Sequence, residues 1–185
     1  MKKSIFIISL GISTLALTAS CGNKENKEGS DTDSLDQPSA PTPRESEGDM
    51  ERTYSAKIQG NNYSITISRK TDKSLPTVKD DLDTEFYDNS VTVKIARNGG
   101  EFYSKTFTKE AFKGFLTDGD YDKCVLNGMA YDEEKSGGGH ICIAAMVGQP
   151  GLGEGHAFTL DIPTDGSTAS IVKAEQQQDA EGPQE

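Results

Sequence analysis

The chain has 185 residues, of which 33% are hydrophobic and none is Trp, and its formal net charge at pH 7 is -11. This length allows one domain or a small pair, because single hydrophobic cores usually span about 100 to 200 residues. The acidic excess argues against a nucleic-acid surface, because phosphate binding requires clustered Lys and Arg side chains. We therefore expect a solvated acidic protein without a nucleic-acid partner.

The first twenty residues have the pattern of a secretory signal peptide. Lys2 and Lys3 precede the mostly apolar run Ile5–Leu17, which is too short to cross a bilayer core of roughly 30 Å. Small residues lie directly before Cys21, and this pattern resembles a bacterial lipobox, although Thr18 stands where such boxes usually have Leu. We therefore expect Cys21 to be acylated and to become the new N-terminus. The alternative is an ordinary cleaved signal that leaves an exposed, reactive thiol.

Acylation would determine where the protein resides. Each buried methylene of an acyl chain such as palmitate contributes about 0.8 kcal/mol, so two or three chains hold a protein on a membrane without a spanning helix. We expect export and lipid anchoring to the bacterial outer membrane, facing the periplasm or the cell surface. Residues 21–52 are polar and rich in Pro, which predicts a disordered tether, and the acidic residues 175–185 predict a frayed tail.

Residues 53–174 are predicted to form one β-rich globular domain. Apolar residues alternate with polar ones in Tyr54–Ile58 and Tyr63–Ile67, which indicates a hairpin. Val91–Ile95 and Phe102–Phe107 flank an Asn-Gly-Gly turn and indicate a second hairpin.

The rest of this domain is predicted to contain one helix and four strands. The period-two alternation stops in Thr108–Leu116, where Phe112, Phe115 and Leu116 instead have helical spacing. We therefore expect a short helix there with its aromatic side chains in the core. The four strands that follow are Lys123–Tyr131, His140–Val147, Ala157–Ile162 and Ser167–Val172.

The fold class follows from these elements. Ile141–Val147 is apolar on both faces, which favours a central, doubly covered strand, and a helix is the competing interpretation. We predict a mainly β fold, an antiparallel meander of about eight strands that forms a barrel or sandwich with one short helix.

Two cysteines fall within the predicted domain. A disulfide between Cys124 and Cys142 would contribute roughly 3 kcal/mol in the chain-entropy model. A hairpin turn at residues 133–139 instead places Cys124 opposite Gly148 and Cys142 opposite Ala130. This register favours two buried free thiols, and the disulfide is the alternative.

No pattern in the chain assigns catalytic, metal-binding or cofactor-binding residues. Asp118, Asp120 and Asp122 resemble the first half of a calcium loop, but Lys123 stands where an EF-hand needs Gly, so we interpret the segment as an acidic turn. The only histidines, His140 and His156, limit any zinc or acid–base proposal.

A glycine-rich segment is the candidate ligand loop, and it consists of Gly151, Leu152, Gly153, Glu154 and Gly155. Its spacing differs from that of nucleotide-binding loops, and a strand rather than a helix follows it, so no helix N-terminus can receive a phosphate. If the domain binds a ligand in a groove, we expect this loop at its rim.

The lipobox, the tether and the segments Phe86–Val91 and Phe107–Phe112 resemble a family of small Bacteroidota lipoproteins with a domain of unknown function, over roughly Tyr54–Val172. The resemblance implies a surface or periplasmic lipoprotein with no established activity and no catalytic residues to transfer. Lysozyme-inhibitor lipoproteins have a similar design, but their disulfide-stapled signature is not evident here.

We therefore expect a non-catalytic binding or interaction module of the cell envelope, with an unknown protein or glycan as its ligand. One alternative is an inhibitor of a basic hydrolase such as lysozyme, steered by acidic loops. Residues 53–174 hold 13 basic and 17 acidic residues, a net charge of -4 against -11 for the whole chain, so most of the net negative charge lies outside this domain and the inhibitor hypothesis is weakened. Another alternative is an envelope hydrolase that uses carboxylates from Asp118, Asp120 or Asp122.

Overall fold

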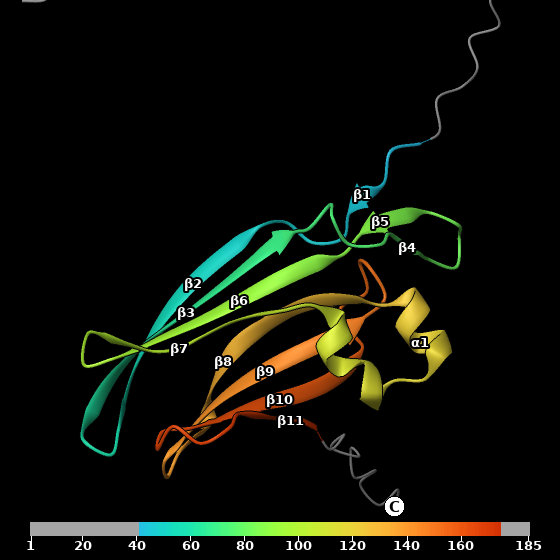
Figure 1. The fold of residues 1–185 in the computed structure, drawn as a ribbon. Helices are drawn as coiled ribbons and strands as arrows, with labels where there is room; N and C mark the ends of the chain where they lie inside the picture. The colour runs from blue at the N-terminus through green and yellow to red at the C-terminus, as the bar shows by residue number, and fades with distance from the viewer. Residues whose placement is uncertain (1–40, 175–185) are drawn as a thin grey trace, which may run out of the picture. The chain divides into compact units, whose positions relative to one another are not determined.

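The computed structural model describes residues 41–174, which form eleven strands, one 3-10 helix and one short α-helix (Figure 1). The strands are β1 (Arg44–Glu45), β2 (Met50–Ile58), β3 (Asn61–Thr71), β4 (Val78–Lys79), β5 (Glu85–Tyr87), β6 (Asn89–Arg97), β7 (Gly100–Phe107), β8 (Val125–Gly137), β9 (His140–Gly148), β10 (His156–Pro163) and β11 (Ser170–Lys173). The helices are η1 (Lys109–Phe115) and α1 (Asp118–Lys123).

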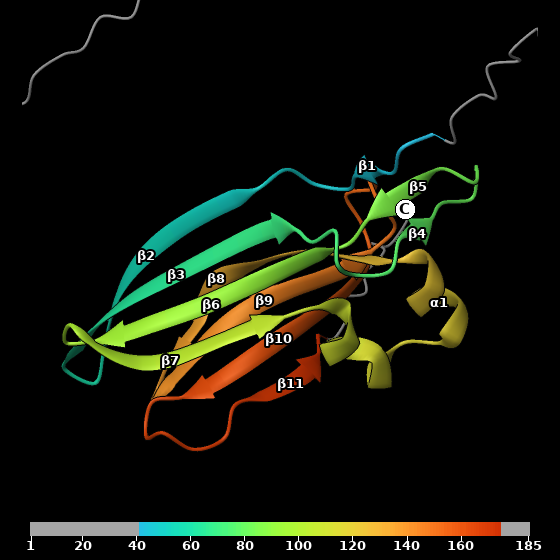
Figure 2. The same ribbon diagram turned by 45° about the horizontal axis from the view of Figure 1, so that its top comes forward.

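Two four-stranded antiparallel sheets form a sandwich (Figures 1 and 2). The strand order is β2-β3-β6-β7 in the first sheet and β11-β10-β9-β8 in the second, and η1 and α1 make the crossing between them. A small third sheet has the order β1-β5-β4, with β1 parallel to β5. The sheets do not close into a barrel. The predicted β class is therefore confirmed as a sandwich, and its two large sheets hold eight strands.

Both predicted hairpins are present, and their turns have the chemistry that tight hairpins require. Gln59 and Gly60 between β2 and β3 have φ of 48° and 80°, and Asn98 and Gly99 between β6 and β7 have φ of 52° and 86°. Two consecutive residues with positive φ match the right-handed twist of the flanking strands, and Asn and Gly adopt that conformation most readily.

The hydrophobic core fills the space between the two large sheets. Its largest fully buried side chains are Ile65, Ile67, Ile95 and Phe107 from the first sheet and Leu126, Ile141, Ile143, Phe158, Leu160 and Ile162 from the second. Burying each such side chain contributes about 1.5 to 3 kcal/mol. Outside the β-bulges, alternate residues of the strands in the two large sheets point inward, so the period-two pattern in the sequence determines which face of each sheet is buried.

The predicted helix at residues 108–116 is a 3-10 helix, and only part of its aromatic stripe is buried. Phe112 is fully buried, with its ring centroid 4.9 Å from that of Phe158. Phe115 is 41% exposed, so its predicted place in the core is wrong. Residues three apart lie on the same side of a 3-10 helix, so Phe115 also faces Phe158, with ring centroids 5.7 Å apart, but as the last residue of η1 it lies at the margin of the core.

Two other expectations are corrected by the structure. The segment Asp118–Asp122 is not an acidic turn but most of α1, because the Thr117 hydroxyl caps the helix by accepting a hydrogen bond from Asp120 N at 3.2 Å. The folded part also begins before Thr53, because β1 and the first residues of β2 lie in the segment assigned to the tether. The predicted signal peptide, Cys21 and the tail at residues 175–185 lie outside the described residues. Within residues 41–174, no helix combines the length and apolarity needed to cross a bilayer.

Candidate functional site

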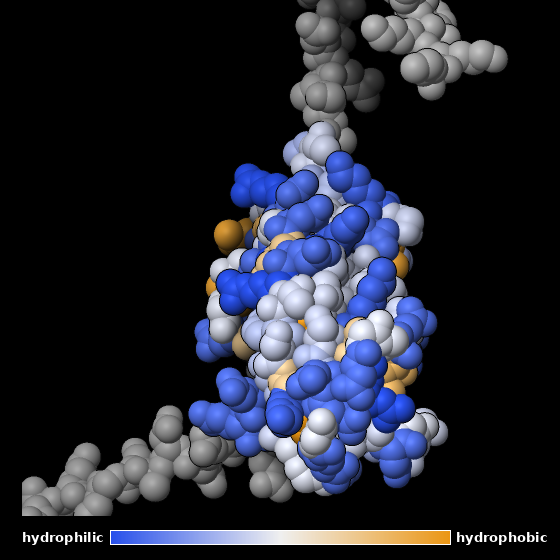
Figure 3. Space-filling view, turned by 90° about the vertical axis from the view of Figure 1, so that its left-hand side faces the viewer, coloured by the Kyte–Doolittle hydropathy of each residue, from blue (hydrophilic) through white to orange (hydrophobic). Residues whose placement is uncertain are grey.

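The outer faces of the two large sheets differ in chemistry. The face of the first sheet carries hydroxyl pairs, with Thr53 and Thr66 Oγ1 atoms 3.0 Å apart and those of Thr92 and Thr106 2.8 Å apart. Figure 3 shows a mainly hydrophilic surface, with scattered hydrophobic residues, at the end of the domain that carries the β2–β3 and β6–β7 turns. These surfaces are typical of sheets that face water.

The outer face of the second sheet instead carries an apolar patch, with Asp132 and Asp161 on the same face nearer the β8–β9 turn. In the register of this sheet Ala144 lies opposite Ala130, and Met146 lies between Gly128 and Ala157. These residues alternate with the core residues of the same strands, so they face away from the first sheet. An apolar patch that faces solvent in a small domain is typical of an interaction site.

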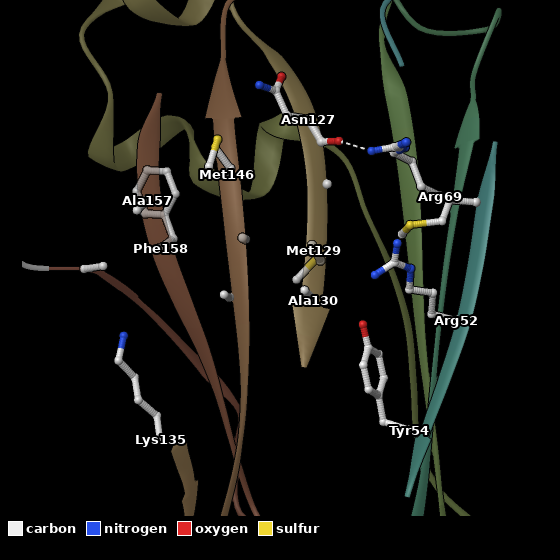
Figure 4. A pocket seen from close by; sticks show the side chains of 15 residues that line it. Arg52, Tyr54, Arg69, Asn127, Met129, Ala130, Lys135, Met146, Ala157 and Phe158 are labelled. Atoms are coloured by element: carbon white, nitrogen blue, oxygen red, sulfur yellow. Dashed lines mark hydrogen bonds between the residues drawn. The ribbon is translucent and has the colours of Figure 1, made fainter. Parts of the chain in front are cut away.

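This apolar face forms the floor of a groove with a volume of about 410 Å³, which we call the outer groove (Figure 4). Its lining residues are Met50, Arg52, Tyr54, Arg69, Asn127, Gly128, Met129, Ala130, Lys135, Ala144, Ala145, Met146, Ala157, Phe158 and Ala174. The volume lies within the range of about 300 to 1,000 Å³ that is usual for small-molecule sites.

The edge strand β2 forms one wall of the outer groove. Strand β8 packs against β3 and β6, so the inward face of β2 extends past β8. Met50 and Tyr54 on this face are therefore only half-buried and Arg52 is exposed. The Tyr54 ring lies 5.6 Å from that of Tyr131, which holds the tyrosine against β8.

Three cationic side chains line the outer groove, and two of them already have partners. Arg69 donates from Nε and Nη2 to Gly48 O at 3.1 and 2.8 Å and from Nη1 to Asn127 O at 2.5 Å. Lys135 Nζ lies 3.5 Å from Asp132 Oδ2. The Arg52 side chain has no hydrogen bond or ion pair with any residue of the described domain, although its backbone belongs to the β2–β3 ladder. It is therefore the cation available to a ligand.

Arg52 and Tyr54 act from the same side of the outer groove. Figure 4 shows both side chains projecting from β2 toward the floor strands, with the guanidinium near the phenol hydroxyl. Residues two apart on a strand share one face, so β2 places the two polar groups side by side. The tether predicted for residues 21–52 includes Met50 and Arg52, so this wall was not predicted from the sequence. The alternation of these two residues with Tyr54 continues the strand pattern and was the signal for it.

The predicted ligand loop, Gly151 to Gly155, does not line the outer groove. Its base is tightly closed, because a Cβ built on Gly155 would lie 2.6 Å from Val147 O and 2.7 Å from Gly148 Cα. The loop therefore forms no part of the outer groove, and a ligand bound at the loop itself stays a prediction.

Of the acidic and histidine candidates, the structure brings only Asp120 and His156 into contact within the described residues. Asp120 Oδ2 lies 3.6 Å from His156 Nε2, and the pKa of Asp120 is lowered, chiefly by the hydrogen bond from the Thr117 hydroxyl. A general acid at neutral pH needs a raised pKa instead. His140 contacts Asp161 at 2.8 Å and lies at the opposite end of the β9–β10 pair. No cluster of three or more metal-ligating side chains occurs within residues 41–174.

Cys124 and Cys142 are free and buried, so the favoured prediction of two buried thiols is confirmed and the alternative disulfide is wrong. Cys142 lies opposite Asp132 rather than Ala130, because irregularities at Leu126/Gly128 and Asp132/Gly137 shift the register of β8. Burial raises the pKa of both thiols, which makes them poor nucleophiles.

A buried polar cluster lies at residues that the sequence patterns did not mark as a site. Asp88, Asn89 and Lys109 have 1%, 0% and 8% of their surface exposed. Lys109 Nζ donates to Cys124 O at 2.9 Å and to Tyr121 O at 3.1 Å, and it lies 3.7 Å from Asp88 Oδ2. The cluster therefore connects the start of β6 with η1 and with the chain that enters β8.

Burial dominates the electrostatics of this cluster. Asp88 Oδ1 accepts hydrogen bonds from Asn89 N at 2.7 Å and Leu126 N at 2.9 Å. Loss of solvation nevertheless raises the pKa of Asp88, against the opposing effects of these bonds and of Lys109. The two segments that carry the family resemblance, Phe86–Val91 and Phe107–Phe112, contain all three residues of the cluster. The resemblance of these two segments to the family was therefore the sequence signal that could have indicated the buried polar cluster.

Comparisons with known proteins bear on the family alone. No curated protein matched the chain. The model of a domain of unknown function, DUF4738, matches residues 30–169. This span includes every strand from β1 to β10, both helices and the buried polar cluster. The chain therefore belongs to the DUF4738 family.

Proposed function

We propose that this protein is a lipid-anchored, non-catalytic binding module of the bacterial cell envelope, and that the outer groove is its ligand site. The observation that carries the proposal is the apolar floor formed by Ala130, Ala144, Met146 and Ala157 on a face that solvent reaches. Apolar surface of this kind is retained in a small domain when something covers it.

The anchor is supported by the N-terminal sequence. A basic start, a short apolar run and small residues before Cys21 resemble a lipobox, and small envelope lipoproteins of Bacteroidota are the class that the chain resembles. Lipidation of Cys21, export and attachment to the outer membrane are therefore part of the proposal. The ligand is a molecule of the envelope, and the protein and glycan ligands expected from the sequence are included in the test below.

Binding is favoured over catalysis by the composition of the groove lining. The side chains that line it include cationic, phenolic, amide and apolar groups but no carboxylate, imidazole or thiol. Those three groups are the usual general acids, bases and nucleophiles of hydrolases. A groove without them can hold a ligand but has few means to transform it.

A photo-crosslinking residue tests the site in cells. Placed at Ala144 on the groove floor, it is expected to capture a discrete envelope species after irradiation. The matched control is Ser104, which is exposed on the outer face of the first sheet, opposite Lys94, and lines no part of the groove. Capture of the same species from both positions, or from neither, would remove the outer groove as the ligand site.

A further inference from the structure

The outer groove also indicates the chemistry of its ligand. Resting on the proposed function, we propose that the groove binds a free single-chain amphiphile with an acidic head group, of the long-chain fatty acid class. The alkyl chain lies along the floor, and Arg52 and Tyr54 receive the carboxylate.

The floor favours an alkyl chain over an extended peptide. Strands β9 and β10 are hydrogen-bonded to neighbours on both edges, so their outer face offers a ligand only side chains. A peptide laid on this face would bury N–H and C=O groups without partners, which is costly. Methylene groups require no partners, and they gain from contact with Ala144, Met146 and Ala157.

The size of the outer groove favours a small molecule over a folded partner. Its volume of about 410 Å³ suits a small ligand. A stable protein–protein interface buries about 800 Å² on each partner. The floor spans only the three strands β8, β9 and β10, whose neighbours are about 4.8 Å apart, so it is roughly 10 Å wide.

The head-group site follows from the distribution of cations. Arg52 has no partner among the described residues, whereas the donors of Arg69 are directed to Gly48 and Asn127 and Lys135 is paired with Asp132. A guanidinium binds a carboxylate through two parallel hydrogen bonds. The neighbouring Tyr54 hydroxyl can donate a third.

The charge of the domain favours a free acid over a lipid that remains in an anionic bilayer. The described residues 41–174 hold 15 basic and 21 acidic residues, so the domain as a whole is repelled by an anionic membrane surface. A free acid molecule brings a single negative charge, which is attracted by the nearby guanidinium of Arg52 without bringing the domain to an anionic surface. The proposal therefore commits to a free amphiphile.

Calorimetric titration of the full chain carrying Cys21→Ser tests the proposal. The probes are hexadecanoate, hexadecan-1-ol and hexadecyltrimethylammonium, each below its micelle concentration. We expect hexadecanoate to bind with 1:1 stoichiometry and the other two at least about 10-fold more weakly, because hydrogen bonds to a charged group are the stronger ones. Ala144→Trp should abolish this binding by filling the floor, and Ser104→Trp should leave it unchanged.

The charge variants separate the head-group contact from general attraction. Arg52→Gln should weaken hexadecanoate binding by at least about 10-fold and leave the alcohol unaffected, because only the carboxylate uses the guanidinium. Lys135→Gln removes a cation that is already paired, so the affinity should change less than about 3-fold. Equal binding of the alcohol, or no effect of Arg52→Gln, would overturn the proposal.

Two further outcomes keep this inference distinct from the proposed function. Binding to phosphatidylglycerol vesicles that requires Arg52, without binding of free hexadecanoate, would show a membrane-resident lipid and overturn the choice of a free acid. If hexadecanoate fails to bind while Ala144 still captures an envelope species specifically, the ligand class is wrong and the site stands. If both experiments fail, the outer groove is not the ligand site.

Discussion

Lys109 is an unusual residue because its ammonium group is buried in a β-sandwich and satisfied mainly by backbone. Two backbone carbonyl oxygens accept hydrogen bonds from this ammonium group, and the Asp88 carboxylate supplies the compensating charge. Burial opposes both charges, and it raises the pKa of Asp88. Such a pair adds little net stability relative to an apolar pair, but removing one member leaves an uncompensated charge in the interior.

Lys109→Met is expected to lower the free energy of unfolding by about 3 kcal/mol, because Asp88 then remains buried without a cation. Asp88→Asn combined with Lys109→Met should recover part of this loss by removing the stranded charge. Urea denaturation of the single and double variants measures the coupling. The control is Lys113→Met, in the same helix but exposed, which should change stability by less than about 0.5 kcal/mol. A double variant no more stable than Lys109→Met would contradict the electrostatic explanation.

The connection between β9 and β10 shows how one element is shaped by close backbone approach. Gly148 and Gly155 lie against each other at its base, with no room for a side chain on Gly155. A glycine in such a place is required for space rather than for a special φ angle. The same loop holds Gly153, whose Cβ position is open.

Gly155→Ala is therefore expected to destabilise the domain by about 1 to 3 kcal/mol, because the added methyl would meet Val147 O and Gly148 Cα and force the strand ends apart. Gly153→Ala should be nearly neutral, since nothing lies within 4 Å of its Cβ position. Thermal denaturation compares the two variants. Equal effects would show that general loss of glycine flexibility, and not contact at the base, determines the result.

Several elements could be predicted from sequence because the signals that define them are local. The β2–β3 and β6–β7 hairpins follow from period-two alternation and from turns that favour positive φ. The register of β8 could not be predicted, because the irregularity between Asp132 and Gly137 inserts residues that no local pattern marks. Residues 44–52 were missed for a related reason: they are polar, and they are held by long-range bonds to Arg69.

The outer groove was missed because it exists only in the assembled molecule. Its wall comes from β2 and its floor from β8 to β10, and the lining residues of these strands are about 70 residues or more apart in the chain. Ile141–Val147 was correctly predicted as a central strand, but its second apolar face was assigned to the core. That face is the groove floor, and alternation alone cannot distinguish an apolar face that meets another layer from one that meets a ligand.

At the scale of the whole molecule, the proposed anchor determines where the groove operates. Cys21→Ala is expected to move the protein from the membrane fraction to the soluble fraction and to abolish incorporation of labelled palmitate, because acyl chains supply the membrane affinity. Cell fractionation and metabolic labelling measure both effects. Cys124→Ala is the control, since this buried thiol should have no part in anchoring. Retention of the Cys21→Ala protein on the membrane would contradict the lipid anchor.

Arg69 also determines how the domain responds to mechanical load. Tension applied to the chain before Ala40 enters the sandwich through residues 44–49 and would peel the edge strand β2 from β3, beginning at the pair Met50–Arg69. At that point Arg69 donates two hydrogen bonds to Gly48 O, and Asp49 Oδ1 accepts a hydrogen bond from Thr71 N at 3.0 Å. A pull from the N-terminal side is therefore expected to load the inner strand β3 through these hydrogen bonds before β2 separates from it.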